Sequence, residues 1–269
     1  MKFFNNNIIF IALLLLILLL ILYSFSQKVS TMENMEDNIG PAPIEIVVSR
    51  YNEDLNWLNE PIFKKYPVVC YNKGVNDTFN KPPNMKKIVK VKNVGRCDHT
   101  YLYHIVSNYD NLADVTIFLP GSTNMPKKME KAKMQIEEVE QHKNTVFIGM
   151  HHPNGVKEMY KDFYLDNWVA SDTTNQKINP EASLKRAEPR PFINWYQKHF
   201  RDIHVEYSSY LGILGISREH IVQHPKSYYE NLLKELDDHS NPEVGHYFER
   251  AWAAVFYPMI NAKFIPFHA

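Results

Sequence analysis

Short apolar runs alternate with amphipathic segments along most of the chain. Five runs rich in β-branched residues have the length and composition of buried strands: 44–49, 68–71, 88–91, 115–119 and 145–150. Helical spacing of apolar residues predicts helices over 101–109, 126–142, 191–200 and 226–236, and another from residue 241. Alternating strands and helices predict an α/β fold with a mostly parallel sheet flanked by helices.

Polar side chains are concentrated in one turn before a predicted helix. The turn contains, within seven residues, Asn93, Gly95, Arg96, Asp98 and His99. The apolar residues at helical spacing that follow it leave His104 on the opposite, polar face. A polar turn before a helix, followed by a strand that ends in a glycine turn, is where α/β proteins hold ligands.

Each of the first four predicted strands ends in a polar segment. These segments are Arg50-Tyr51-Asn52-Glu53, Asn72-Lys73-Gly74, Asn93-Val94-Gly95-Arg96 and Pro120-Gly121-Ser122. In an open parallel sheet they would converge along the carboxyl edge, where ligands bind. Ordinary turns are the alternative, because Asn and Gly mark turns. Arg and Lys do not form turns, which favours a convergent site.

The last predicted helix carries a second polar group. Asn241 is expected to cap it, with Pro242 at its first position. Spacings of three and four residues place His246, Glu249 and Arg250 on one face. This face is either a surface ion-pair network or part of the site, with Glu249 or His246 as base or acceptor ligand.

The N-terminus predicts a membrane anchor. Residues 8–25 are apolar and uncharged, and about 18 such residues are the lower limit for crossing a bilayer. We interpret them as an uncleaved signal anchor after a short tail, 1–7. A cleaved signal peptide is the alternative, although the residues after the run make a poor cleavage site.

The remaining chain divides into a polar stem, 26–43, and a single α/β domain, 44–269. A short N-terminal tail followed by a large domain is the layout of a single-pass type II membrane protein, with its domain in the secretory lumen or outside the cell. Asn76-Asp77-Thr78 is an N-glycosylation sequon and agrees with that placement.

Composition narrows the possible partners. Lys and Arg together number 30, as do Asp and Glu, so no overall positive charge attracts nucleic acid, and we expect no nucleic-acid partner. Cys70 and Cys97 are the only cysteines in the sequence; they form either one disulfide or two free thiols. The sequence lacks GxSxG, Walker A, HExxH, GxGxxG and Asp-x-Asp motifs.

Several blocks resemble a family that is known only as a domain of unknown function. They are VVSRYNEDLNWL, YNKG, NVGRCDHTYLYHIVSNYDNLADVTIFLPGS and HYFERAWAAVF. The chain is also similar to GT-A glycosyltransferases, especially rhamnan-synthesis-type enzymes with an Asn-x-Gly-Arg-Asp turn before a helix. Asn93, Gly95 and Arg96 match that turn, whereas Cys97 stands at its acidic position and Asp98 follows.

The GT-A resemblance implies a nucleotide-sugar donor and a glycan acceptor. The Arg50–Glu53 segment would contact the nucleotide, Lys73 and Arg96 the phosphates, and Asp98 or Glu249 would act as base. Pro120-Gly121-Ser122 stands where the family has its metal-binding Asp-x-Asp, so dependence on Mn²⁺ or Mg²⁺ is left open and no metal ligand is assigned.

Two other functions are compatible with the sequence. The missing Asp-x-Asp favours a membrane-anchored protein of the same fold that binds a glycan or nucleotide sugar without turnover. The histidines His99, His151 and His152 suggest a metal-dependent hydrolase, although adjacent histidines point in different directions and make a poor metal pair.

Overall fold

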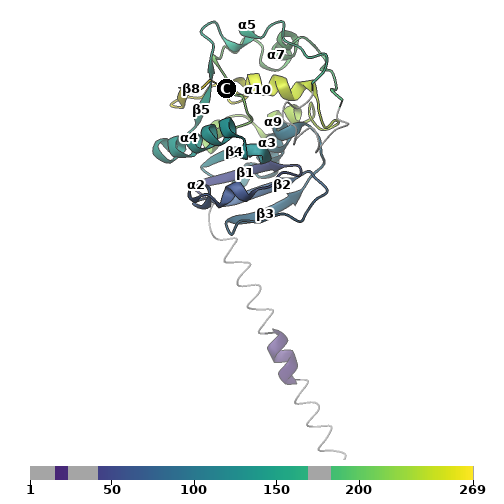
Figure 1. Ribbon diagram of the computed structural model, residues 1–269, viewed down its shortest axis with the longest axis vertical. Coiled ribbons are helices and arrows are strands. Elements are labelled where there is room, and N and C mark those ends of the chain that lie inside the picture. Colours follow the sequence, from purple (N-terminus) through teal and green to yellow (C-terminus); the bar gives the residue numbers. More distant parts are fainter. Residues whose placement is uncertain (1–15, 24–41, 169–182, 269) are drawn as a thin grey trace, which may run out of the picture. The chain divides into compact units, whose positions relative to one another are not determined.

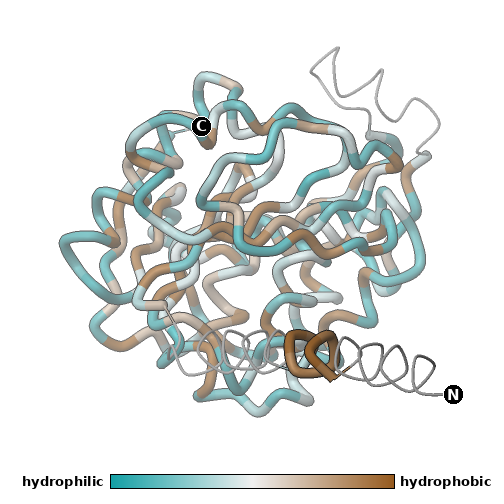
Figure 2. The backbone as a smooth tube through the Cα atoms, turned by 90° about the horizontal axis from the view of Figure 1, so that it is seen from below, coloured by the Kyte–Doolittle hydropathy of each residue, from teal (hydrophilic) through white to brown (hydrophobic). Residues whose placement is uncertain are grey.

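A computed structural model describes residues 16–23, 42–168 and 183–268 (Figure 1). The chain divides into two compact units, Met1–Pro41 and Ala42–Ala269. In the first unit, residues 16–23 are helical and hydrophobic (Figure 2). None of the helices in the described ranges is both long enough and apolar enough to cross a bilayer. The other residues of the predicted anchor, the tail 1–7 and most of the stem lie outside the described residues.

The second unit is built on one sheet. Its described strands are β1 (Ile44–Arg50), β2 (Val68–Asn72), β3 (Met85–Lys90), β4 (Val115–Pro120), β5 (Val146–His151), β6 (Tyr207–Ser208), β7 (Leu214–Ser217) and β8 (Lys263–Pro266). They follow the order β3-β2-β1-β4-β7-β5-β6, and β8 pairs with β5. The five predicted strands are confirmed, with small changes at their ends.

The sheet is mostly parallel but mixed. β3, β2, β1 and β4 are parallel neighbours, and β7 runs antiparallel between β4 and β5. The chain proceeds outward from β1 to β3 and then returns to place β4 on the other side of β1. Ligands bind beyond the carboxyl ends of the strands at such a reversal of strand order. Register places Arg50 beside Asn72, and Ser49 beside Pro120, at that edge.

Helices cover both faces of the sheet (Figure 1). The described helices are η1 (Asn56–Asn59), α2 (Pro61–Lys64), α3 (Arg96–Ser107), η2 (Tyr109–Asn111), η3 (Gly121–Asn124), α4 (Pro126–His142), α5 (Val156–Met159), α7 (Phe192–Phe200), α8 (Arg218–Val222), α9 (Lys226–Leu233) and α10 (Glu243–Val255). Val47 belongs to the core under α3, α9 and α10, whereas Ile46 and Val48 belong to the core under α2 and α4. The strands are therefore buried on both faces, as their continuous apolar runs predict.

Two local predictions are wrong. His104 is 2% exposed, and its Nδ1 lies 3.0 Å from the hydroxyl of Tyr71 on β2, because α3 is covered by the sheet and by other helices. α10 begins at Glu243 with Pro242 at the cap position, one residue later than predicted. Pro242 has the extended backbone that a cap position requires, and no side-chain cap bond is made there.

Candidate functional site

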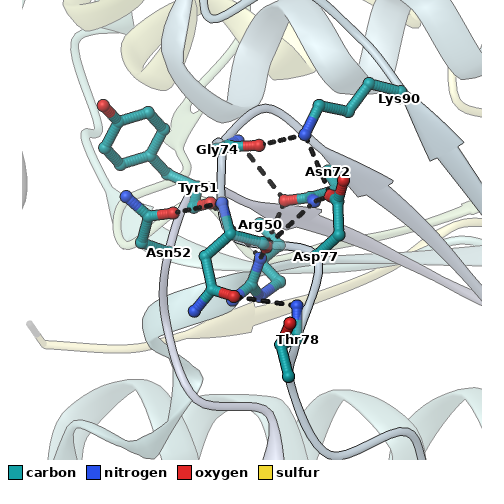
Figure 3. A network of polar contacts seen from close by, with 9 residues as sticks. Arg50, Tyr51, Asn52, Asn72, Gly74, Asp77, Thr78 and Lys90 are labelled. Carbon is teal, nitrogen blue, oxygen red and sulfur yellow. Dashed lines mark hydrogen bonds and ion pairs between the residues drawn. The ribbon is translucent and has the colours of Figure 1, made fainter.

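The guanidinium of Arg50 joins the loops that follow β1 and β2 (Figure 3). Arg50 is 1% exposed, and its Nε donates to Glu53 O at 2.8 Å. Its Nη1 donates to Asn72 Oδ1 and to Asn76 O, each at 2.8 Å, and the ring of Phe79 lies 3.9 Å from Cζ. Burial lowers the pKa of Arg50. The guanidinium thus binds the protein itself, so we assign it a structural role.

These loops approach each other closely. A Cβ at Gly74 would lie 1.6 Å from Tyr51 O, so only glycine fits. Asn52 Oδ1 accepts a hydrogen bond from Asn76 N at 3.4 Å, and Asn76 itself is exposed. The half-buried Tyr51 ring points away from the network (Figure 3) and has no hydrogen bond or ring contact within the described residues. Its ring is therefore free to contact a ligand.

Buried Lys73 fixes the turn that leads into α3. Gly95 and Arg96 have φ angles of 57° and 54°, a left-handed conformation that is unfavourable for arginine. Lys73 Nζ donates to Val94 O at 2.5 Å and also to Arg96 O, on either side of Gly95. Burial lowers the pKa of Lys73 to about 7. Lys73 therefore positions Arg96, and its ammonium is bound to backbone oxygens.

α10 brings its predicted polar face to Arg96. Arg96 Nη1 donates to His246 Nε2, and His246 Nδ1 lies 3.5 Å from Glu249 Oε2. Burial lowers the pKa of His246, so we assign a neutral imidazole that accepts at Nε2 and carries its proton on Nδ1. The ring of Trp168 covers the Arg96 guanidinium at 4.2 Å. The row Arg96–His246–Glu249 thus links α3 to α10.

The two candidate bases have different environments. Asp98 is fully buried, accepts from Trp252 Nε1 at 3.0 Å, and has a pKa raised to about 7 by burial and by the charge of Glu249. Burial also raises the pKa of Glu249, but the hydrogen bond with His246 and the charge of Arg96 outweigh it and lower that pKa to about 2. The Glu249 side chain is 16% exposed. Glu249 is therefore ionised and partly accessible. Asp98 is inaccessible, and it is protonated below a pH of about 7.

α4 contributes two lysines that its sequence pattern assigns to solvent. Lys131 is 1% exposed and donates to Tyr210 O at 2.7 Å and Ser209 Oγ at 3.2 Å. Lys128 donates to Ser122 Oγ at 2.6 Å. Burial lowers the pKa of both lysines, that of Lys131 to about 7. Their spacing of three residues, directly after a loop at a strand's carboxyl end, was the available signal in the sequence.

The loop after β4 lies against the loop after β1. A Cβ at Gly121 would lie 2.7 Å from Glu53 Oε2 and 3.2 Å from Ser49 O. Trp57 Nε1 donates to Gly121 O at 3.0 Å, and Pro120 ends β4 beside Ser49. The carboxylate of Glu53 is therefore next to the backbone of Gly121.

Four cations surround Glu249, and we refer to Arg96, Lys128, Lys131 and Arg250 as the cation cluster. The charge of Glu249 acts on both lysines, and both arginines act on Glu249. Within the described residues, no member of the cluster has a carboxylate oxygen within 4.0 Å. The two arginines alone therefore carry more positive charge than the single carboxylate of Glu249, and the two lysines add to it.

Two predicted site residues have less direct roles. Asn93 is half-buried and makes no hydrogen bond in the described part of the chain. His99 is 6% exposed and stacks on Tyr103 with 5.9 Å between ring centroids. Burial, with the charge of Lys73, lowers the pKa of His99 to about 3, so its imidazole is neutral.

The adjacent histidines His151 and His152 contact different partners. His151 Nε2 lies 3.2 Å from Glu206 Oε2, whereas His152 Nε2 lies 2.8 Å from Ser208 Oγ. Within the described ranges, no group of three or more His, Cys, Asp or Glu residues is placed to hold a metal ion. Cys70 and Cys97 are free thiols.

A family model described as "Protein of unknown function (DUF3431)" matches residues 46–263. The chain belongs to this family. The resemblance of its sequence blocks to a domain of unknown function is thereby confirmed. A search of curated proteins found no match.

The DUF3431 region contains the whole candidate site. It extends from β1, which carries Arg50, through α3 and α4 to α10, which carries Glu249 and Arg250. The predicted membrane anchor, 8–25, precedes it.

Proposed function

We propose that this DUF3431 protein is a glycosyltransferase, which transfers a sugar from a nucleotide-sugar donor to a glycan acceptor. The observation that carries the proposal is the cation cluster. Lys131 and Arg250 are buried, and Arg96 and Lys128 are half-buried. Cations that are shielded from water and have no carboxylate partner are costly, and an anionic ligand would balance them. A nucleotide sugar brings a diphosphate, and the cluster lies at the sheet edge where α/β proteins bind nucleotides. The similarity to GT-A enzymes agrees with this location.

Arg96 and Lys128 are the proposed diphosphate ligands. Arg96 offers a planar set of donors, one of which contacts His246. Within the described residues, the only hydrogen bond of the Lys128 ammonium is to the neutral hydroxyl of Ser122. The half-buried side chains of Tyr51, Asn52 and Glu53 lie beyond the end of β1 and would contact the nucleoside. Arg50 and Lys73 would support these loops from behind.

Glu249 is the proposed base. It would take the proton of an acceptor hydroxyl while that oxygen attacks the anomeric carbon of the donor. The bond from that carbon to the phosphate oxygen would break, and its electron pair would leave with the nucleoside diphosphate. A bound diphosphate offsets the charge of Arg96 and so raises the pKa of Glu249 toward the ordinary range, which strengthens the base.

The residues after β4 do not fit a divalent metal. Ser122 Oγ accepts from the Lys128 ammonium and Gly121 O accepts from Trp57 Nε1. Glu53 is the nearby carboxylate, and cation sites of this kind need several oxygen ligands. The proposed reaction therefore assigns the stabilisation of the leaving diphosphate to Arg96 and Lys128.

The proposed location is a membrane of the secretory pathway, with residues 8–25 as the anchor and the domain in the lumen or outside the cell. The hydrophobic helix over 16–23 supports an anchor in this part of the chain. Exposure of Asn76 supports glycosylation of its side chain.

A binding protein without turnover is the second candidate. It is favoured by the loop Pro120-Gly121-Ser122, which replaces the acidic metal-binding motif of GT-A enzymes. Such a protein would use the same cation cluster to hold a nucleotide sugar.

An assay of donor turnover distinguishes the glycosyltransferase from the binding protein. Full-length protein in detergent would be mixed with a panel of nucleotide sugars and glycan acceptors, and released nucleoside diphosphate would be measured. We expect release from one donor class, and a decrease of about 10²- to 10⁴-fold in Glu249→Gln, the range for loss of a general base. Glu158→Gln changes an exposed glutamate outside the site and serves as control. Donor binding without release from any donor would contradict a transferase and favour the binding protein.

A further inference from the structure

The two buried arginines at the carboxyl edge differ in how their donors are used. Arg50 donates to backbone or side-chain oxygens of Glu53, Tyr51, Asn72 and Asn76. Arg250 is 9% exposed, yet within the described residues it makes a single hydrogen bond, from Nη1 to the carbonyl of its own helix neighbour four residues before, at 2.7 Å. An arginine has five N–H donors.

The Nε of Arg250 is buried and has no hydrogen-bond partner in the described part of the chain. A buried donor without a partner costs about 1–3 kcal/mol, and an unpaired buried charge costs more. Aromatic rings compensate in part, because Arg250 Cζ lies 3.6 Å from the ring centroid of Phe163, 5.0 Å from that of Tyr160 and 5.3 Å from that of Tyr210. The unused donors remain.

The aromatic rings around Arg250 are held in place. Tyr210 Oη donates to Tyr160 Oη at 2.9 Å, and Tyr160 Oη lies 3.1 Å from His152 Nε2. His152 is in turn 2.8 Å from Ser208 Oγ. Side chains that are already ordered before a ligand binds lose little conformational entropy on binding. This group is separate from Arg96, whose guanidinium packs on Trp168.

We propose that Arg250 binds the carboxylate of an acidic acceptor sugar, such as a uronic acid, next to Glu249. The inference rests on the proposed function and specifies its acceptor. A carboxylate matches the planar guanidinium and carries one charge, which balances one arginine. Arg96 belongs to the proposed donor site and Arg250 to the proposed acceptor site. The charges of both arginines lower the pKa of Glu249.

The test compares two acceptors that differ only at their carboxyl groups: a trisaccharide of galacturonic acid, with three carboxylates, and the same trisaccharide after reduction of these carboxylates to hydroxymethyl groups. Their affinities for the full-length protein in detergent would be measured by ligand-observed NMR titration. We expect the acidic trisaccharide to bind about ten-fold more tightly or better, the effect of one charged hydrogen-bond pair. Equal affinities would overturn the inference.

Variants of Arg250 test whether this residue causes the preference for the acidic trisaccharide. In Arg250→Gln, the ratio of the two affinities should fall to about one, and in Arg250→Lys it should lie between. Arg186→Gln, at a 65% exposed position, is the matched control. An unchanged ratio in a folded Arg250→Gln protein would overturn the inference; if that variant does not fold, the wild-type ratio and Arg250→Lys decide. Tighter binding of the carboxyl-reduced trisaccharide carrying one phosphate, compared with the acidic trisaccharide, would overturn the choice of a carboxylate.

Binding of a nucleoside diphosphate, measured on the same wild-type sample, distinguishes failure of the proposed transferase function from failure of the acidic-acceptor inference. If the acid preference is present and the nucleotide does not bind, the proposed transferase fails and the acidic-sugar site stands. If the nucleotide binds and both trisaccharides bind equally, the acceptor inference alone fails.

Discussion

At the scale of single residues, surroundings rather than residue type decide which groups are available for chemistry. Asp98 and Glu249 carry the same carboxyl group and lie close enough that the charge of Glu249 raises the pKa of Asp98. Asp98 is enclosed by protein and accepts from Trp252, whereas Glu249 is partly exposed and faces the cation cluster. Pairs of acids with pKa values moved in opposite directions are typical of acid–base sites. Glu249 is therefore the proposed base, and Asp98 joins the first turn of α3 to Trp252 on α10.

The pKa of Asp98 predicts a pH-dependent stability difference. An aspartate in an unfolded chain has a pKa of about 3.9. Because the folded pKa is raised to about 7, the folded state binds the extra proton between these values, and the contribution of Asp98 is lost as pH rises from 4 to 7. Asp98→Asn lacks this titration, so the variant should gain stability relative to wild type over that range, by at most about 4 kcal/mol.

Urea denaturation at pH 4.5 and pH 8, followed by tryptophan fluorescence, measures this difference. Glu158→Asn at an exposed position should show no comparable pH trend. A constant difference between Asp98→Asn and wild type at both pH values would contradict a raised pKa.

At the scale of elements, the first five strands were predictable, whereas the short or exposed strands and the inward-facing charges were not. β1, β2, β4 and β5 are buried on both faces and so leave continuous apolar runs in the sequence. β6 has only two residues and β8 is largely exposed, so neither leaves such a run. Lys128 and Lys131 lie on a helix dominated by Lys and Glu, where a lysine that turns inward looks like any other. Sequence likewise cannot distinguish Arg50, which makes four hydrogen bonds to oxygens of the protein, from Arg250, which makes one within the described residues.

The contact between the loops after β1 and β2 predicts a sharp effect of one methyl group. In Gly74→Ala, the new Cβ would meet Tyr51 O, a backbone atom, and the loops must separate. We expect a loss of about 3 kcal/mol or more in the free energy of unfolding, the upper range for overpacking. The measurement is urea denaturation of full-length protein in detergent.

Gly245→Ala provides the comparison. Its Cβ would meet first the flexible side chain of Arg96, at 3.2 Å, and alanine is favoured within a helix such as α10 by about 1 kcal/mol. The free energy of unfolding of this variant should differ from that of wild type by no more than about 1 kcal/mol. A Gly74→Ala protein as stable as Gly245→Ala would contradict the described loop contact.

At the scale of the whole molecule, charge is distributed unevenly. The chain is neutral overall, with 30 basic and 30 acidic residues, yet positive charge collects around Glu249 at the carboxyl edge of the sheet. Local charge of this kind attracts a small anionic ligand, whereas a polyanion would need an extended basic surface. The hydrophobic N-terminal segment adds a proposed location for the reaction.

The proposed location predicts two properties of the full-length protein in eukaryotic cells. Residues 8–25 should keep it in the membrane fraction after alkaline carbonate extraction. Treatment with a glycosidase specific for N-glycans should increase its gel mobility, and Asn76→Gln should remove that change. Release by carbonate would contradict an uncleaved anchor. An anchored protein without the glycosidase effect would contradict modification of Asn76.

Binding of a nucleoside diphosphate by the cation cluster is the central claim, and thermal unfolding tests it most directly. Full-length protein in detergent would be heated with nucleoside diphosphates and nucleotide sugars, in wild type, Lys128→Gln and Lys127→Gln. Ligand at 100 times its dissociation constant adds about 2.7 kcal/mol to the stability, which is readily visible. We predict a shift with one nucleotide class in wild type and in Lys127→Gln, whose lysine is exposed, and a much smaller shift in Lys128→Gln. No shift with any nucleotide in a cooperatively unfolding wild-type sample would contradict the account.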